Sequence, residues 1–336
     1  MGLMQMASGL GSAAAFLLGG YIVGPLGWQG GYWIMTISAA ASTCVTFAFL
    51  PAAARSAEHA FDWLGAALWI GAVGGVGSLI SLLTQRISAL LVVLGSVGAV
   101  ITAICVTLFC WREFRSPRHL FAWPLLRRDS FRYGVLASFL VQTSRGGLLF
   151  VLPFLLISGE GYSAQATGLA VVGLPLAEVT MALVSGWWAD RRGPGEPAMA
   201  GTGMAVISLG LFAGLSAWGS AMGIAVLVVL TGLGFGLFYS ANNSSAMGSV
   251  TGPSEAGSAS GTLATAISGG MVFGPALAGG LIALNVKHLS GATALQAGGQ
   301  IAVAFMAGLS LVACLFLLRA ASRRTEQPPT SAHGRP

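Results

Sequence analysis

The sequence predicts an all-α protein: a polytopic transmembrane helical bundle of about ten spans. Hydrophobic residues make up 55% of the 336 residues, charged residues make up 8%, and the mean hydropathy is +0.81. The hydrophobic residues form long continuous stretches, and a spanning helix needs roughly 20 such residues. A barrel strand would alternate apolar and polar residues instead. The composition therefore excludes a water-soluble domain with a polar surface.

Short segments separate the apolar stretches and define ten predicted helices. We place the helices at residues 4–25, 30–51, 62–84, 88–111, 133–158, 165–188, 197–217, 220–245, 258–285 and 296–319. Many of the 49 glycines lie inside these ranges. Glycine weakens a helix in water, but in a membrane small residues let helices approach closely. The glycine content therefore favours closely packed membrane helices.

The positions of arginine and lysine predict the orientation of the helices. If the odd-numbered helices start on one side, that side carries 13 of the 16 cations; the other side carries Arg86 and Lys287, and Arg145 lies within a span. Positively charged loops stay in the cytoplasm, so both termini are predicted to be cytoplasmic. Fifteen arginines against one lysine, with abundant alanine and glycine, suggest a GC-rich bacterial genome and so a bacterial cytoplasmic (cell inner) membrane. The net charge of +6 then reports topology, and no partner role for nucleic acid is predicted.

Two of the predicted helices share a spacing of small residues. Small residues recur at Gly261, Gly270, Gly274-Pro275 and Gly279 in the ninth helix, and at Gly2, Gly11, Ala15, Gly19 and Gly20 in the first. The match indicates an internal repeat, which is typical of secondary transporters.

A second pattern lies between the sixth and seventh helices. The segment Gly186-Trp187-Trp188-Ala189-Asp190-Arg191-Arg192-Gly193 resembles the G-x-x-x-D-R-x-G loop of the major facilitator superfamily. In that family the loop joins the second and third helices of each six-helix half. The resemblance implies that Gly186, Asp190, Arg191 and Gly193 form a conformational loop motif. The alternative is a solvated loop whose arginines only set topology.

The two patterns give the same helix numbering. The spacing in the first and ninth helices resembles the glycine-rich antiporter motif of the fifth helix of a half, and the loop makes the sixth helix second in its half. Residues 133–320 would then form a complete C-terminal half. The resemblance implies that residues 1–52 are the last two helices of the N-terminal half and that 53–132 are an inserted helix pair with a basic loop. The tail 321–336 is predicted to be disordered.

This arrangement is similar to the fourteen-helix drug:proton antiporter branch, lacking its first four helices. The N-terminal half would be incomplete, which favours a truncated product over a functional ten-helix design. Ala15-Phe16 also departs from the Gly-Pro of the family motif.

Few ionisable residues lie deep within a predicted span. Arg145 and Glu178 lie near the middle of the fifth and sixth helices, and Gln142 lies one turn before Arg145. A midspan arginine costs roughly 2.5–3.5 kcal/mol and needs a partner or water. These residues are predicted to line a substrate or proton pathway; an Arg145–Glu178 pair that only fixes helix packing is the alternative. Asn242 and Asn243 are assigned to the same pathway, or to hydrogen bonds between helices.

The residues and the resemblance together predict a secondary active transporter, with proton-coupled efflux of drugs or small amphipathic compounds. The expected partners are the lipid bilayer, a small-molecule substrate and protons. No nucleophile, metal or cofactor constellation is visible, so an enzyme is not predicted. Two alternatives stay open: a non-transporting fragment or structural membrane protein, and a metabolite permease of the same superfamily. The identity of the substrate, the coupling ion and the oligomeric state are not encoded in any pattern found.

Overall fold

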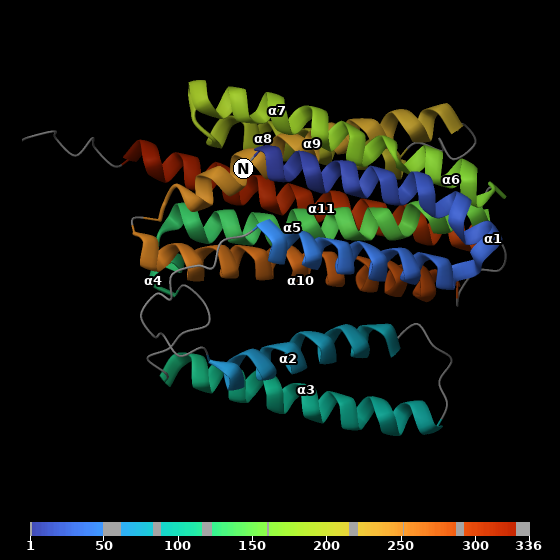
Figure 1. Ribbon diagram of the computed structural model, residues 1–336, viewed down its shortest axis with the longest axis horizontal. Helices are drawn as coiled ribbons and strands as arrows, with labels where there is room; N and C mark the ends of the chain where they lie inside the picture. The colour runs from blue at the N-terminus through green and yellow to red at the C-terminus, as the bar shows by residue number, and fades with distance from the viewer. Residues whose placement is uncertain are drawn as a thin grey trace, which may run out of the picture.

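A computed structural model of the chain describes residues 2–49, 62–82, 89–115, 123–159, 161–214, 221–250, 252–286 and 292–326. Regular structure in these ranges is helical, which confirms the all-α prediction (Figure 1). The helices are α1 (Gly2–Phe49), α2 (Trp63–Leu82), α3 (Ala89–Arg115), α4 (Trp123–Leu126), α5 (Asp129–Phe154), α6 (Ala164–Val171), α7 (Gly173–Arg192), α8 (Gly195–Gly214), α9 (Ala221–Met247), α10 (Pro253–Val286) and α11 (Ala292–Glu326). A short π-helical turn, Leu155–Gly159, follows α5.

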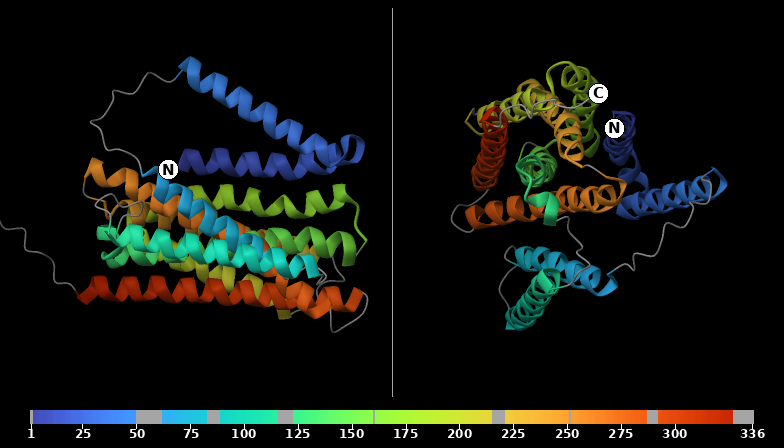
Figure 2. Two further views of the ribbon diagram at one scale, coloured as in Figure 1. Left: turned by 90° about the horizontal axis from the view of Figure 1, so that it is seen from below. Right: turned by 90° about the vertical axis from the view of Figure 1, so that its left-hand side faces the viewer.

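Apolar helices occupy the predicted spans within the described ranges. Eight are long and apolar enough to cross a membrane, and Ala7–Gly19 and Trp63–Leu79 are shorter apolar helices. Two of these ten lie within α1, where Gly27 has a φ of 63° and interrupts the helix. Figure 2 shows the chain turning back at this point, so that the second half of α1 runs away from the bundle. Residues 32–49 are exposed along their whole length.

Helices α5 to α11 form the body of the molecule, with α5 at its centre (Figure 2, right). Its core joins side chains from several of these helices, among them Leu148, Leu209, Phe235 and Met306. Hydroxyl groups also bond across helix pairs: Ser144 Oγ donates to the carbonyl of Met306 over 2.8 Å. Such bonds and small residues hold membrane helices together, because the lipid is as apolar as the side chains.

The glycines of α9 show how closely these helices approach. A Cβ at Gly234 would meet the backbone of α8 at Gly201, and one at Gly236 would meet the backbone of α7 at Glu178. In the run Gly232-Leu233-Gly234-Phe235-Gly236, the first and last glycines therefore face α7 and the middle glycine faces α8. A larger side chain there would push the helices apart.

The predicted helix 165–188 is divided in the structure. Helix α6 ends at Val171 and α7 begins at Gly173, with Val172 as the residue between them. Pro175 lacks an N–H group, and its ring conflicts with the carbonyl of residue 171, which explains a break at this position.

Helices α2 and α3 form a separate pair, which we call the hairpin pair. Gly71 and Gly75 of α2 face Cys105 and Thr102 of α3. The pair contacts the body through α2, which lies against α10; Figure 1 shows both helices to one side of the bundle.

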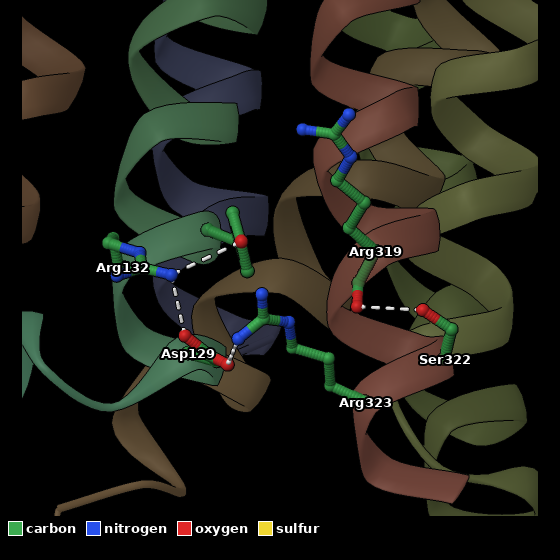
Figure 3. Close-up of polar contacts among 6 residues, drawn as sticks. Asp129, Arg132, Arg319, Ser322 and Arg323 are labelled. Atoms are coloured by element: carbon green, nitrogen blue, oxygen red, sulfur yellow. Dashed lines mark hydrogen bonds and ion pairs between the residues drawn. The ribbon is translucent and has the colours of Figure 1, made fainter. Parts of the chain in front are cut away.

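Many of the described arginines lie at one end of the bundle, the left-hand end in Figure 1. The residues at this arginine-rich end include Arg112, Arg115, Arg127, Arg128, Arg132, Arg191, Arg192, Arg319 and Arg323. Helix α11 continues to Glu326, so the prediction of disorder from residue 321 is wrong for residues 321–326. An ion pair between Arg323 and Asp129 of α5, at 3.1 Å, holds this last turn (Figure 3). Residues 327–336 of the predicted tail lie outside the described residues.

Candidate transport site

The centre of the body holds a two-point ion pair between α5 and α7. Arg145 Nε donates to Glu178 Oε1 over 2.6 Å, and Arg145 Nη2 donates to Glu178 Oε2 over 3.1 Å. The side chains are only 13% and 11% exposed. The two parallel bonds match the fork of the guanidinium to the carboxylate, so each charge has a fixed partner.

Further polar groups surround this pair. Tyr239 of α9 donates its hydroxyl to Gln142 Oε1 over 2.9 Å, and Arg145 Nη1 lies 3.6 Å from the sulfur of Met271. One partly open cavity of about 180 Å³ is lined by Gln142, Arg145, Glu178, Tyr239 and Asn243, among others. Four of the five predicted pathway residues therefore meet here. The cavity is smaller than the roughly 300 Å³ at which ligand pockets begin, so it would have to widen for a drug-sized molecule.

Asn243 leaves one hydrogen-bonding atom unused within the described part of the chain. Its Oδ1 atom is buried and has no hydrogen-bond partner there. A buried acceptor without a partner costs roughly 1–3 kcal/mol. Water or a substrate donor in the cavity could satisfy this atom.

Asn242, the fifth predicted pathway residue, lies apart from the ion pair. Its Nδ2 donates to the carbonyl of Gly134 and to Ser138 Oγ, at 3.0 and 2.8 Å. It thus joins α9 to α5 and lines a different pocket at the arginine-rich end. These contacts match the alternative prediction for Asn242, that it forms hydrogen bonds between helices.

The antiporter-like glycines differ between the two helices. A Cβ at Gly270 or Gly274 of α10 would collide with the backbone of α5, and Gly146 of α5 lies against Pro275. By contrast, a Cβ at Gly11 or Gly19 would meet nothing within 4 Å among the described atoms. The side-chain environment of Gly20 lies outside the described part. The shared spacing therefore does not correspond to shared packing.

The loop motif lies at the arginine-rich end, between α7 and α8. Gly193 ends α7 with a φ of 83°, a conformation that favours glycine, and Gly186 faces Ser240 of α9. Arg191 lies over the ring of Trp187, 4.1 Å from its centroid. The side chain of Asp190 is exposed and makes no hydrogen bond or ion pair within the described ranges, whereas Glu196 accepts from Trp188 Nε1 over 3.2 Å.

Sequence reasoning missed the contribution of α1 to the cavity. Ser8, Gly9 and Ser12 line it, and Gly9 packs against Val179 of α7. Ser8 and Ser12 are four residues apart and so share a helix face, a signal that was present in the sequence.

A bundle of apolar helices around a buried ion pair and cavity defines a polytopic membrane protein with a polar interior site. The model of the Major Facilitator Superfamily matches residues 1–275 and, in a second match, 134–336. The chain belongs to this superfamily.

Several curated proteins are similar to the chain over most of its length. The tetracenomycin C resistance and export protein of Streptomyces glaucescens is 29% identical over 70% of this chain and 43% of its own length. The riboflavin transporter RibZ of Clostridioides difficile is 26% identical over 79% of this chain and 56% of its own length. The multidrug resistance protein Stp of Mycobacterium tuberculosis H37Rv is 25% identical over 84% of this chain and 52% of its own length. The chain thus spans about half the length of the curated relatives it matches.

Proposed function

We propose that the chain provides the helices of a proton-coupled secondary transporter that exports drugs or small amphipathic compounds. The observation that carries the proposal is the Arg145–Glu178 pair, which lines a cavity between α1 and helices of the body. Intramembrane charges commonly face a substrate or ion pathway. The printed names of the export and multidrug resistance relatives support the efflux direction.

The residues of the cavity have distinct roles in this proposal. Glu178 is the proton acceptor, and Arg145 holds its carboxylate while it is ionised. Proton binding to Glu178 would weaken the ion pair, free the guanidinium and so favour a second conformation. Gln142, Tyr239 and Asn243 offer hydrogen bonds to the substrate.

The proposal extends to topology and helix numbering. The arginine-rich end faces the cytoplasm, in agreement with the distribution of cations. Asp190 and Arg191 act there as a conformational switch, since Asp190 is exposed and without a bond in the described conformation. The helices correspond to the fifth to fourteenth of the fourteen-helix branch, with α2 and α3 as the inserted pair.

Proteoliposomes containing the chain test this function. We expect an imposed proton gradient to drive ethidium transport, and Glu178→Gln to remove the dependence on the gradient. Asp62→Asn is the matched control, because Asp62 forms a similar two-point pair with Arg112 in the hairpin pair, away from the cavity. A variant with Arg145→Glu and Glu178→Arg keeps opposite charges together. If this reversed pair or Glu178→Gln transports normally, the pair is a packing element and the proposal fails.

A metabolite permease is the second candidate, and the similarity to a riboflavin transporter favours it. Riboflavin offered to the same proteoliposomes distinguishes the two. Riboflavin flux without ethidium flux would support the permease. If neither ethidium nor riboflavin is transported, with or without the proton gradient, the result would favour a non-transporting, structural protein.

A further inference from the structure

The arginine-rich end of α5 and α11 contains more positive than negative charge. Asp129 Oδ1 accepts from Arg132 over 2.6 Å, and its Oδ2 accepts from Arg323 over 3.1 Å (Figure 3). Both carboxylate oxygens are therefore occupied by these two arginines. With Arg319, three arginines and one aspartate lie at this end of the two helices, which leaves an excess of two positive charges within the group.

Arg319 is the cation of this group without a carboxylate partner. Its guanidinium makes no hydrogen bond or ion pair with any described residue, and Figure 3 shows it extending away from Asp129. Its carbonyl accepts from Ser322, which leaves the side chain unaffected. The apolar span of α11 covers Leu295–Arg323, so Arg319 lies one turn inside the end of that span. A charge at this depth needs an anion or water.

A shallow apolar groove, open at the surface of α11 and lined by residues of this helix, lies directly beside this guanidinium. Val312, Leu315, Phe316, Leu318, Arg319 and Ser322 line the groove, which has a volume of about 600 Å³. Leu315 and Leu318 are about half exposed. The ring of Phe316 stacks on the ring of Tyr133, with 5.8 Å between the ring centroids. The guanidinium of Arg132 lies over the same Tyr133 ring, 4.8 Å from its centroid. The apolar groove and the basic cluster are thus parts of one surface.

We propose that this surface binds an anionic phospholipid, with its phosphate at Arg319 and one acyl chain in the groove. The charge excess complements an anionic headgroup, and the apolar residues lie on the hydrocarbon side of the arginine, as an acyl chain requires. Basic clusters at the ends of membrane helices attract anionic lipids with about 1 kcal/mol per arginine. This site is separate from the Arg145–Glu178 cavity, and none of its groove residues lines that cavity.

Native mass spectrometry of the full chain, titrated with palmitoyl-oleoyl phosphatidylglycerol or the corresponding phosphatidylcholine, tests the site. We expect tighter retention of phosphatidylglycerol and about a fivefold loss of its affinity in Arg319→Ala, since one arginine contributes about that factor. Arg127→Ala is the matched control: it removes one exposed arginine from the same end but not from the groove. It should leave the affinity unchanged.

Four outcomes would overturn the proposal. Equal losses in both variants would mean that the lipid responds to total charge. Equal retention of phosphatidylcholine would remove the role of the headgroup. Displacement of the lipid by inorganic phosphate, or equal binding of dihexanoyl phosphatidylglycerol, would show that the groove holds no acyl chain. Thermal unfolding of each variant checks that a loss of binding is not a loss of fold.

Discussion

The body of α5 to α11 and the hairpin pair of α2 and α3 each contain an aspartate or glutamate in a two-point pair with arginine. In the body, Glu178 and Arg145 are both nearly buried, at 11% and 13% exposure, and lie beside a cavity. In the hairpin pair, the side chain of Asp62 is 5% exposed but that of Arg112 is 35% exposed, and the pair lies at the helix ends. The same two-point geometry thus occurs in two settings: the interior pair lies beside a cavity, and the terminal pair joins the ends of α2 and α3.

The largest expected effect comes from unpairing the interior charges. Arg145→Ala or Glu178→Ala leaves a buried charge without its partner, which should lower the free energy of unfolding by about 3–5 kcal/mol. The reversed pair should recover most of this loss. Unfolding in mixed detergent and SDS micelles, followed by circular dichroism, measures the difference. A loss below about 1 kcal/mol in both single variants would mean that water already reaches the pair.

The second effect concerns the glycines. Gly274→Ala places a Cβ against the backbone of α5 and should destabilise the body by about 1–3 kcal/mol, because backbone cannot move aside as a side chain can. Gly11→Ala, where the added Cβ meets no described atom within 4 Å, should instead be neutral or stabilise its helix by up to about 1 kcal/mol. The same unfolding assay reads both signs. Equal changes in stability for the two variants would contradict the inference that α10 packs more closely than α1 at these glycines.

A smaller and more local effect is expected at the start of α2. Asp62 Oδ1 accepts from the backbone N–H of Gly65 over 2.8 Å and so caps this helix. Asp62→Ala should cost about 1 kcal/mol from the lost cap and up to about 1 kcal/mol from the lost pair with the partly exposed Arg112, with faster amide exchange in α2 and unchanged exchange in α5. Hydrogen exchange by mass spectrometry resolves the two helices. Equal acceleration in α5 would show that the hairpin pair and the body unfold together.

The smallest energetic effect tests how the hairpin pair lies on the body. A Cβ at Gly77 would lie 3.5 Å from Val272 Cγ1, so Gly77→Cys with Val272→Cys should form a disulfide with little change in stability. Gly74→Cys with Val272→Cys is the matched control, because Gly74 faces open space. Non-reducing peptide mapping detects the link. Efficient linking of the control, or none in the test pair, would contradict the contact between α2 and α10.

Much of the architecture was predictable because hydrophobicity alone sets where membrane helices lie. Arg145 and Glu178 stood out for the same reason: a charge is rare and costly at midspan, and the two lie at similar depth. The break at Val172 could be anticipated only in part, since a proline kinks a helix without fixing where the chain divides.

Other features depended on three-dimensional packing that spacing does not encode. Gly11 and Gly270 occupy matching positions in the repeat, yet a Cβ would collide with backbone only at Gly270. Asn242 and Asn243 are neighbours in sequence, but they point to different pockets because adjacent residues on a helix lie about 100° apart. The pairing of Asp62 with Arg112 joins residues 50 positions apart, and no local pattern identifies it.

The reversal at Gly27 has a consequence for how the chain enters a membrane. One residue with a φ of 63° connects two apolar helices, so almost no hydrophilic segment lies between them. A polar loop is what must be carried across the hydrocarbon when successive spans insert one at a time. Without such a loop, the two halves of α1 can enter the bilayer together as a preformed helical hairpin. The turn at Gly27 then crosses the bilayer, and the two ends opposite the turn stay on the side from which the hairpin enters.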